Sequence, residues 1–335
     1  QFSYVSGDYN FQGLKEIKKF LINDRTTYYL SLPIRIELVK EVVLGLAKAK
    51  LLSGEFRMVI EKPFGTDYET ANELMSFLEQ SVGKDNLFLI DHYLSKDIVR
   101  NLISLRFANP IFENMWSNKH IEKIEIRALE MVGIENRGQY YDVTGAIKDM
   151  IQNHLLQILS LVLMNKPNLL NHTSVEREKI KILKNLQIYN NEFDDNVIID
   201  QYKGYLTEDY VEKDSLTETY ALLKVEINNE RWKGVPIILE TGKKQKQKTT
   251  QITVYFKGFE ECPWNENCPS ITKNKLVLNI YPDNDIQLFI NSNYSKPEEI
   301  KQIPLEFSFS KDVDLSLPYA NVLRDIHNND KTYCP

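Results

Sequence analysis

Short apolar runs and helical patterns alternate along the chain as far as Leu105, and this alternation constrains the fold more than any other feature of the sequence. The apolar runs are typical of strands and lie at residues 2–5, 28–32, 57–60 and 87–90. Amphipathic patterns with the helical period lie between them, at residues 14–22, 36–52 and 68–82. Strands that alternate with helices predict a parallel, doubly wound α/β sheet, which binds ligands at the carboxyl edge of its strands.

The pattern changes after Leu105. Residues 121–130 are typical of a strand, and residues 145–164 and 175–184 are typical of helices. Period-two alternation then dominates, at residues 220–227, 251–256, 275–280 and 286–290. This alternation predicts a large antiparallel sheet with helices on one face. We therefore predict an α/β unit followed by a larger α+β unit.

Composition excludes several classes of protein. The 335 residues suffice for about two domains, and the 42% hydrophobic and 26% charged content is that of a globular protein. The net charge of -6 argues against broad nucleic-acid binding. The most apolar stretch, residues 155–164, is too short to span a bilayer, and no secretory signal is visible. We therefore expect neither a nucleic-acid nor a membrane partner.

Cysteine usage indicates the compartment. The three cysteines, Cys262, Cys268 and Cys334, are too few for a disulfide framework and favour a reducing cytoplasm. Cys262 and Cys268 have no histidine nearby, so a zinc site there would lack half of its ligands. We therefore expect no metal.

Polar side chains gather where the apolar run at residues 87–90 ends. Asp91, His92, Tyr93 and Lys96 follow it, and an amphipathic helical pattern comes next. His92 and Lys96 are four residues apart, so on a helix they would share one face near an N-terminus that attracts anions. This arrangement favours a phosphate clamp. Taken alone, the segment fits better with a polar helix start, in which Asp91 is the cap and Lys96 lies in solvent.

His154 lies on the helix predicted at residues 145–164. At about 100° per residue it falls on the apolar stripe, so its imidazole should point into the interior. Such a histidine is usually a hydrogen-bonded core residue, but a catalytic base needs the same half-buried position and an orienting carboxylate. Asp149 is nearest in sequence, yet it lies about 140° away around an α-helix. We therefore expect the orienting carboxylate to come from elsewhere.

Two further segments carry candidate residues. In Glu61-Lys62-Pro63-Phe64-Gly65, proline after a strand end permits a cis bond, which would expose Lys62 at the sheet edge. Several sugar oxidoreductases share a motif of this kind, so it is only moderately specific. Between Arg231 and Lys248 a strand runs into glycine and a basic run, which usually indicates a solvated loop.

Taken together, these four segments resemble the glucose-6-phosphate dehydrogenases, in the same order and over nearly the whole chain. The family signature Asp-His-Tyr-Leu-Gly-Lys is matched at residues 91–96, with Ser95 in place of glycine. Residues 61–65 and the Gln-Asn-His-Leu-Leu-Gln at residues 152–157 are identical to family motifs. The pattern Asn-Glu-Arg-Trp-x-Gly-Val-Pro recurs at residues 229–236, followed by Gly242-Lys243.

The resemblance implies an NADP-dependent enzyme that oxidises glucose 6-phosphate at C1 to 6-phosphogluconolactone, the first step of the pentose phosphate pathway. It implies that His154 is the general base and that Asp91 orients it. The residues it implies for substrate binding are Lys62, His92, Tyr93, Lys96, Glu130, Asp149, Lys243 and Lys248. Those it implies for the nicotinamide site are Tyr4, Leu32, Pro33, Lys62 and Pro63.

The resemblance also implies a domain organisation. Residues 1–91 would be the carboxyl half of a Rossmann-like dinucleotide-binding domain, and residues 92–335 the substrate-binding and oligomerisation domain of a homodimer or homotetramer. The family's Gly-x-x-Gly-Asp-Leu fingerprint does not occur in the chain, so we expect that an upstream segment is absent. Thr249 and Asn279 stand where animal members carry basic residues for a second, structural NADP, which leaves that site open. A fusion to a 6-phosphogluconolactonase, as in some protozoan members, is not tested by the sequence.

Two other functions remain to be distinguished. A sugar dehydrogenase for unphosphorylated substrates would have no use for a phosphate clamp at residues 91–96, which argues against it. A non-enzymatic module that binds sugar phosphates without a nucleotide site stays open.

Overall fold

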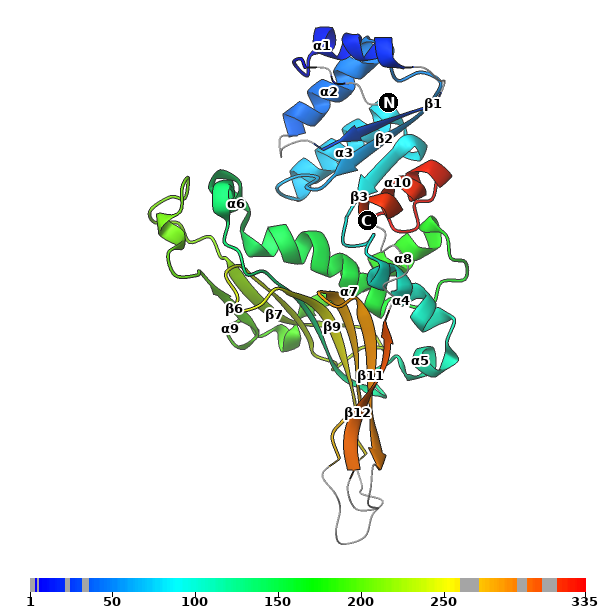
Figure 1. Ribbon diagram of the computed structural model, residues 1–335, viewed down its shortest axis with the longest axis vertical. Helices are drawn as coiled ribbons and strands as arrows, with labels where there is room; N and C mark the ends of the chain where they lie inside the picture. The colour runs from blue at the N-terminus through cyan, green and yellow to red at the C-terminus, as the bar shows by residue number, and fades with distance from the viewer. Residues whose placement is uncertain are drawn as a thin grey trace. The chain divides into compact units, whose positions relative to one another are not determined.

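The computed structural model describes residues 4, 6–21, 25–31, 36–259, 271–293, 300–308 and 318–335 (Figure 1). The chain divides into two compact units. Unit 1 comprises residues 1–92 and 322–335, and unit 2 comprises residues 93–321. The predicted division assigned all residues after 91 to one domain, whereas residues 322–335 pack with unit 1. None of the helices in the described ranges is long and apolar enough to cross a membrane.

Unit 1 contains a parallel three-stranded sheet in the order β1-β2-β3. Its strands are β1 (Arg25–Leu30), β2 (Glu55–Glu61) and β3 (Leu87–Ile90). Its helical segments before β3 are α1 (Phe11–Lys15), η1 (Glu16–Phe20), α2 (Ile36–Lys48), α3 (Tyr68–Val82) and η2 (Lys84–Asn86). The predicted alternation of strands and helices is confirmed from residue 11 onward. Of the strand predicted at residues 2–5, only residue 4 lies within the described ranges.

Strand β2 is apolar on both faces because both faces are covered. On one face, Met58 and Ile60 pack in a core with α2 and α3. On the other face, Val59 packs with Val322 and Ile326 of helix α10 (Pro318–Asn328). A strand that is buried on both sides is expected to be a continuous apolar run, and residues 58–60 form such a run directly after Arg57. The cover from α10 explains why the end of the chain belongs to unit 1.

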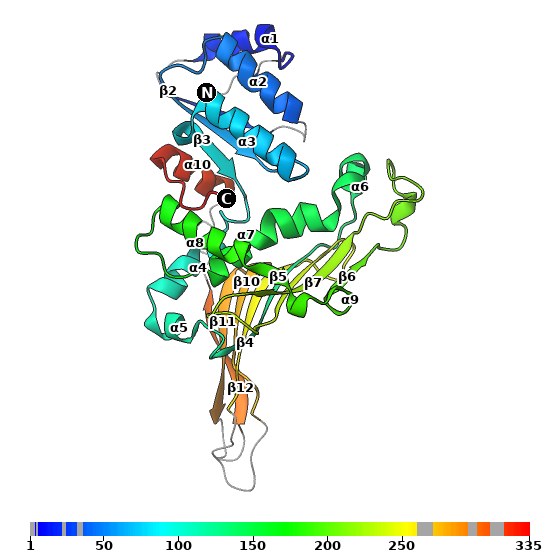
Figure 2. The ribbon, with the colours of Figure 1, turned by 180° about the vertical axis from the view of Figure 1, so that it is seen from behind.

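Unit 2 is built on a nine-stranded sheet in the order β12-β11-β10-β9-β4-β8-β7-β5, with β6 paired to β7 (Figure 2). The strands are β4 (Ile121–Leu129), β5 (Leu186–Ile188), β6 (Val197–Asp200), β7 (Tyr220–Ile227), β8 (Ile237–Gly242), β9 (Thr249–Phe256), β10 (Lys275–Tyr281), β11 (Asp285–Asn293) and β12 (Ile300–Ser308). The antiparallel pairing that the alternation predicted is found at every pair except β4 with β8, which is parallel. Parallel neighbours need a long crossover, and the helices between β4 and β8 supply it.

The helical segments of unit 2 lie mostly between β4 and β7. They are α4 (Asp97–Phe107), α5 (Pro110–Met115), η3 (Glu135–Arg137), α6 (Gly138–Ala146), η4 (Ile147–Leu155), α7 (Leu156–Leu163), α8 (His172–Lys184), η5 (Tyr189–Asn191), α9 (Phe193–Asn196) and η6 (Tyr205–Thr207). Segment η4 is a π-helix that continues directly into α7 and packs on β4 and β8. The helix predicted at residues 145–164 is therefore present, but its first half has a different hydrogen-bonding pattern.

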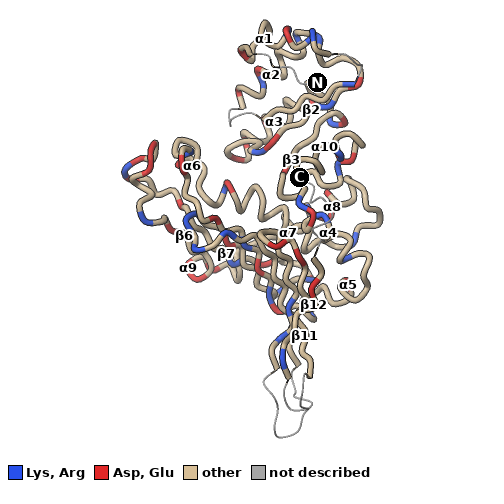
Figure 3. The backbone as a smooth tube through the Cα atoms, in the orientation of Figure 1, with Lys and Arg blue, Asp and Glu red and all other residues tan. Residues whose placement is uncertain are grey.

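Both acidic and basic residues lie along the strands of the unit 2 sheet (Figure 3). Several of them pair across neighbouring strands, such as Arg127 of β4 with Glu240 of β8 at 2.8 Å. Opposite charges on adjacent strands stabilise their pairing modestly. The local charges of this sheet are thus partly neutralised by each other.

Candidate active site

The carboxyl edge of the unit 1 sheet brings two predicted site residues together. Lys62 follows β2 and Asp91 follows β3, and the two strands are parallel neighbours in which Glu61 lies beside Ile90. The Lys62 ammonium lies 2.8 Å from Asp91 Oδ2, with side chains that are 9% and 0% exposed. The Lys62–Pro63 bond is cis, as the motif allowed, but the expectation that the turn exposes Lys62 was wrong. Burial lowers the pKa of Lys62, and the charge of Asp91 opposes this shift.

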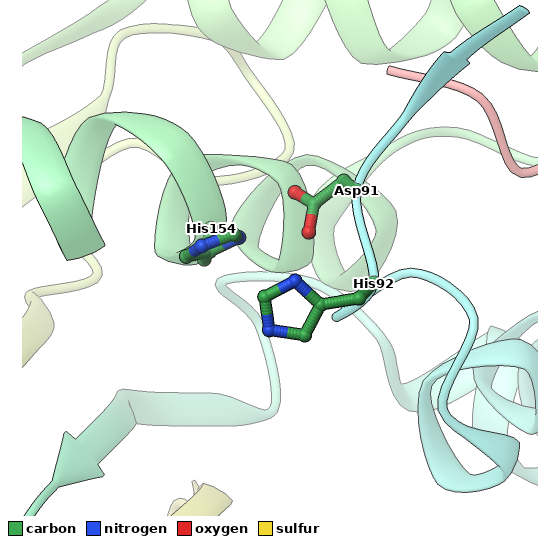
Figure 4. Close-up of side chains that lie close together, drawn as sticks. All are labelled: Asp91, His92 and His154. Carbon is green, nitrogen blue, oxygen red and sulfur yellow. The ribbon is translucent and has the colours of Figure 1, made fainter. Parts of the chain in front are cut away.

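The segment after β3 is a turn, and helix α4 begins only at Asp97. Figure 4 shows Asp91 and His92 directly after the strand, and His154 on its own helix. His92 and Lys96 therefore do not share a helical face, and that expectation was wrong. The residue before the helix is Lys96, so Asp91 is not its cap either. The sequence pattern suggested that the helix begins among the four polar residues, but these residues form a turn and the helix begins after them.

Within unit 2, three predicted site residues form one stack. The rings of Tyr93 and His154 lie 4.4 Å apart between centroids, with 25° between their planes. The Lys96 ammonium lies 4.0 Å from the centroid of the Tyr93 ring, in cation–π geometry. His154 and Tyr93 are both buried. The buried Tyr93 ring restricts rotation of the His154 imidazole. A general base needs an imidazole with a fixed orientation.

The π-helix changes the geometry assumed for His154. Its backbone bonds run from residue i+5 to residue i, as from the amide of Leu156 to the carbonyl of Ile151. The angle of about 140° between Asp149 and His154 assumed the α-helical period, so that premise was wrong. Asp149 accepts a hydrogen bond of 2.9 Å from the Tyr140 hydroxyl. Which carboxylate orients His154 stays a prediction.

The parallel pair β4 and β8 brings two more predicted residues together. Glu130 directly follows β4 and Lys243 directly follows β8, and the strands end in register at Leu129 and Gly242. Parallel strands have their carboxyl ends on the same edge, so the two side chains meet in an ion pair. The Lys243 side chain is only 2% exposed. A carboxylate acceptor and an ammonium donor are thus held side by side.

Tyr141 links this ion pair to the π-helix. Its ring centroid lies 5.5 Å from the Lys243 ammonium. Burial raises the pKa of Tyr141, and the nearby charges of Asp149, Glu218 and Glu130 raise it further. Among the residues that the structure describes, its buried hydroxyl has no hydrogen-bond partner. Burial and the three carboxylates therefore favour the protonated form of this phenol.

Some predicted residues are less informative. Tyr4 is 89% exposed. Lys248 is exposed directly before β9, with its ammonium 4.4 Å from the centroid of the Tyr281 ring. Leu32 and Pro33 lie outside the described residues, as do Cys262 and Cys268.

Sequence reasoning missed Tyr140 and Glu218 as residues of this site. Tyr140 is nine residues before Asp149, on α6, and the non-helical backbone at Gly145 lies between them, so no helical spacing indicated the contact. Glu218 lies 71 residues from its partner Ile147, so no local pattern could have indicated it.

The chain matches two family models along almost all of its length. Residues 1–101 match the NAD binding domain of glucose-6-phosphate dehydrogenase, and residues 103–334 match its C-terminal domain. A glucose-6-phosphate 1-dehydrogenase of Borreliella burgdorferi is 39% identical over 330 residues, which cover 92% of this chain and 67% of that protein. One of Chlamydia muridarum is 33% identical over 338 residues, covering 94% of this chain and 66% of that protein. The chain thus spans about two thirds of the length of these curated relatives.

Solved structures agree with these matches. A crystal structure of glucose-6-phosphate 1-dehydrogenase from Mycobacterium avium has a TM-score of 0.86 and 34% identity, and covers 99% of this chain and 71% of that one. A structure of glucose-6-phosphate dehydrogenase in complex with its substrate glucose-6-phosphate has a TM-score of 0.88 and 31% identity, with 98% and 71% covered. The chain therefore belongs to the glucose-6-phosphate dehydrogenase family.

Proposed function

We propose that this protein is a glucose-6-phosphate 1-dehydrogenase, which oxidises glucose 6-phosphate at C1 to 6-phosphogluconolactone and transfers the hydride to NADP. The observation that carries the proposal is the stack of His154, Tyr93 and Lys96 in a chain of this family, because it combines a buried base with a cation. The family resemblance assigns the role of general base to His154 and phosphate binding to Tyr93 and Lys96.

His154 is the general base of the proposed reaction. It takes the proton from the C1 hydroxyl of the sugar while the hydride leaves C1, so that a carbonyl forms without a separate charged intermediate. The nicotinamide of NADP, when bound, accepts that hydride. The stack on Tyr93 supports the assignment because it fixes the plane of the imidazole. The assignment of Asp91 as the carboxylate that orients His154 is carried by the family resemblance.

The phosphate and the sugar hydroxyls have separate partners in this proposal. Lys96, with His92 and Tyr93, binds the phosphate, since a dianion is best bound by a cation and neutral donors. Lys243 and Lys248 contribute further positive charge. Glu130 and Asp149 accept hydrogen bonds from sugar hydroxyls, as carboxylates beside a buried lysine and a tyrosine can.

The nicotinamide end of NADP fits the carboxyl edge of the unit 1 sheet. Lys62 and Pro63 lie at this edge, where parallel sheets bind their ligands, and Lys62 offers a donor already held by Asp91. Tyr4, Leu32 and Pro33 join them through the resemblance alone. A dinucleotide fold binds the pyrophosphate with a glycine-rich turn, and the sequence contains no Gly-x-Gly-x-x-Gly. We therefore assign nicotinamide contacts to these residues and no pyrophosphate contacts.

The remaining expectations follow the family. We propose a homodimer or homotetramer in the cytoplasm, with no metal in the reaction. We expect neither nucleic acid nor a membrane as a partner.

Reduction of NADP by the full-length protein on addition of glucose 6-phosphate tests the function. We expect saturable turnover with glucose 6-phosphate, and a kcat/KM for free glucose lower by about 10³-fold or more, since the lost phosphate forfeits several charge-assisted bonds. Comparable kcat/KM for both sugars would instead support a dehydrogenase of unphosphorylated sugars. Binding of glucose 6-phosphate without any turnover would support the non-enzymatic module.

A further inference from the structure

The helix that carries Asp149 and His154 is held at its carboxyl end by side chains from outside it. The last carbonyls of α7, at residues 161–163, each accept one side-chain donor. Arg106 donates to the first at 3.0 Å, Trp116 Nε1 to the second at 2.7 Å and Trp232 Nε1 to the third at 2.8 Å. Helix ends leave such carbonyls unsatisfied, so these bonds anchor one end of the helix.

Glu218 holds the backbone at the amino end of the same helix. Glu218 Oε1 accepts the backbone amide of Ile147 at 2.8 Å, and its backbone carbonyl accepts that of Ala146 at 2.9 Å. Gly145, directly before them, has a φ of 67°. A Cβ at Gly145 would lie 2.4 Å from Glu218 Oε1, so only glycine permits this approach. The carboxylate and the glycine are therefore fitted to one another.

A carboxylate suits this position for two reasons. The first amides of a helix have no partner within it, and the i→i+5 bonding of a π-helix leaves one more amide free than an α-helix does. The positive end of the helix dipole also favours an anion. Since π-helices are rare and poorly stable alone, the position of η4 depends on its end contacts more than that of an ordinary helix.

The position of η4 matters because its side chains are those of the proposed reaction. Asp149 lies two residues after Ile147, in the first turn beyond the Glu218 contact. His154 lies further along the same π-helix, against Tyr93. A shift of the amino end would move the sugar-binding carboxylate and the base together.

We infer that Glu218 is a positioning residue of the dehydrogenase, which sets the place of Asp149 and His154 by capping the π-helix that carries them. The inference rests on the proposed function and adds to it a residue that makes no contact with the reacting atoms.

The test compares three variants of the full chain. Glu218→Ala removes the cap, and Glu218→Gln keeps an acceptor oxygen at the same place. Glu226→Ala is the matched control, because Glu226 on β7 also accepts a backbone amide, that of Asn190 at 3.2 Å, but away from the π-helix. The readouts are kcat, the KM for NADP, and the hydrogen-exchange rate of the Ile147 amide.

We expect Glu218→Ala to lower kcat by about 10- to 100-fold, because a displacement near 1 Å costs that much, while the KM for NADP stays within about twofold. Exchange at Ile147 should rise by about tenfold or more, since the amide loses its acceptor. Glu218→Gln should restore kcat to within about threefold of wild type. Glu226→Ala should change neither kcat nor exchange at Ile147.

Two results would overturn the inference. One is a Glu218→Ala variant with wild-type kcat, even if it melts at a lower temperature, since that describes a purely structural residue. The other is unchanged exchange at Ile147, which would mean that Glu218 does not cap the helix. Absence of turnover in the wild type is a different failure, because it refutes the proposed function while faster exchange in Glu218→Ala would still identify the cap.

Discussion

Replacement of Glu113 by glutamine should destabilise unit 2 far more than a typical loss of an ion pair. Glu113 Oε2 accepts a hydrogen bond of 3.0 Å from Arg106, whose side chain is 0% exposed. Its other oxygen lies 2.7 Å from Arg231. Burial lowers the pKa of Arg106, and the charge of Glu113 is the main effect that opposes this shift. Among the described residues Glu113 is the carboxylate that pairs with Arg106, so its replacement leaves the buried guanidinium without that counterion.

The magnitude follows from this environment. Removing one partner of a buried pair costs about 3–5 kcal/mol. We expect the lower end, about 3 kcal/mol, because the Glu113 side chain is 20% exposed and a glutamine still offers one acceptor. For a unit of this size the loss corresponds to a fall in melting temperature of about 6–12 °C.

Denaturant unfolding followed by tryptophan fluorescence measures the effect, because the Trp116 ring lies 5.4 Å from the Arg106 guanidinium carbon. Glu122→Gln is the control. This variant removes the ion pair between Glu122, whose side chain is 39% exposed, and Lys273, whose side chain is 53% exposed. It should change the free energy of unfolding by less than about 0.5 kcal/mol. A Glu113→Gln variant within about 1 kcal/mol of wild type would refute the claim that Arg106 depends on this carboxylate.

Two further predictions concern lysines of the candidate site. An NMR titration of the Lys62 side chain should give a pKa below the ordinary lysine value of about 10.4, and Asp91→Asn should lower it further because it removes the charge that opposes the shift. The folded chain then binds fewer protons than the unfolded chain between these two pKa values, so this group makes the free energy of unfolding rise with pH across that window. An upward shift in Asp91→Asn would contradict the pairing. Lys96→Ala should raise the KM for glucose 6-phosphate at least about tenfold while leaving that for free glucose unchanged, and equal effects on the two sugars would exclude a phosphate contact.

The predictable parts of this fold are those with a local physical cause. The strands at residues 57–60 and 87–90 could be predicted because both faces of the parallel sheet are buried, and β9 because much of it alternates in period two. Strands β5 and β6 were not predicted, since three or four residues are too short for a pattern to show. The parallel pairing of β4 with β8 is a property of topology, which no local pattern encodes.

The candidate site divides in the same way. Glu130 and Lys243 were expected from the family resemblance, but their ion pair depends on strands that are separated by more than 100 residues. The π-helix at residues 147–155 could not be predicted, because its apolar residues have the spacing that is typical of an α-helix. The cap from Glu218 comes from a loop whose sequence has no helical signal of its own.

The most direct test of the proposed reaction is the kcat of a His154→Asn variant of the full chain. Asparagine keeps a polar side chain at a position that is 8% exposed but cannot accept the proton. We expect kcat to fall by about 10²–10⁴-fold while calorimetry shows unchanged affinity for glucose 6-phosphate. His172→Asn, at the start of α8, should retain wild-type kcat as the control. A His154→Asn variant that keeps more than about a tenth of the wild-type kcat would show that His154 is not the base.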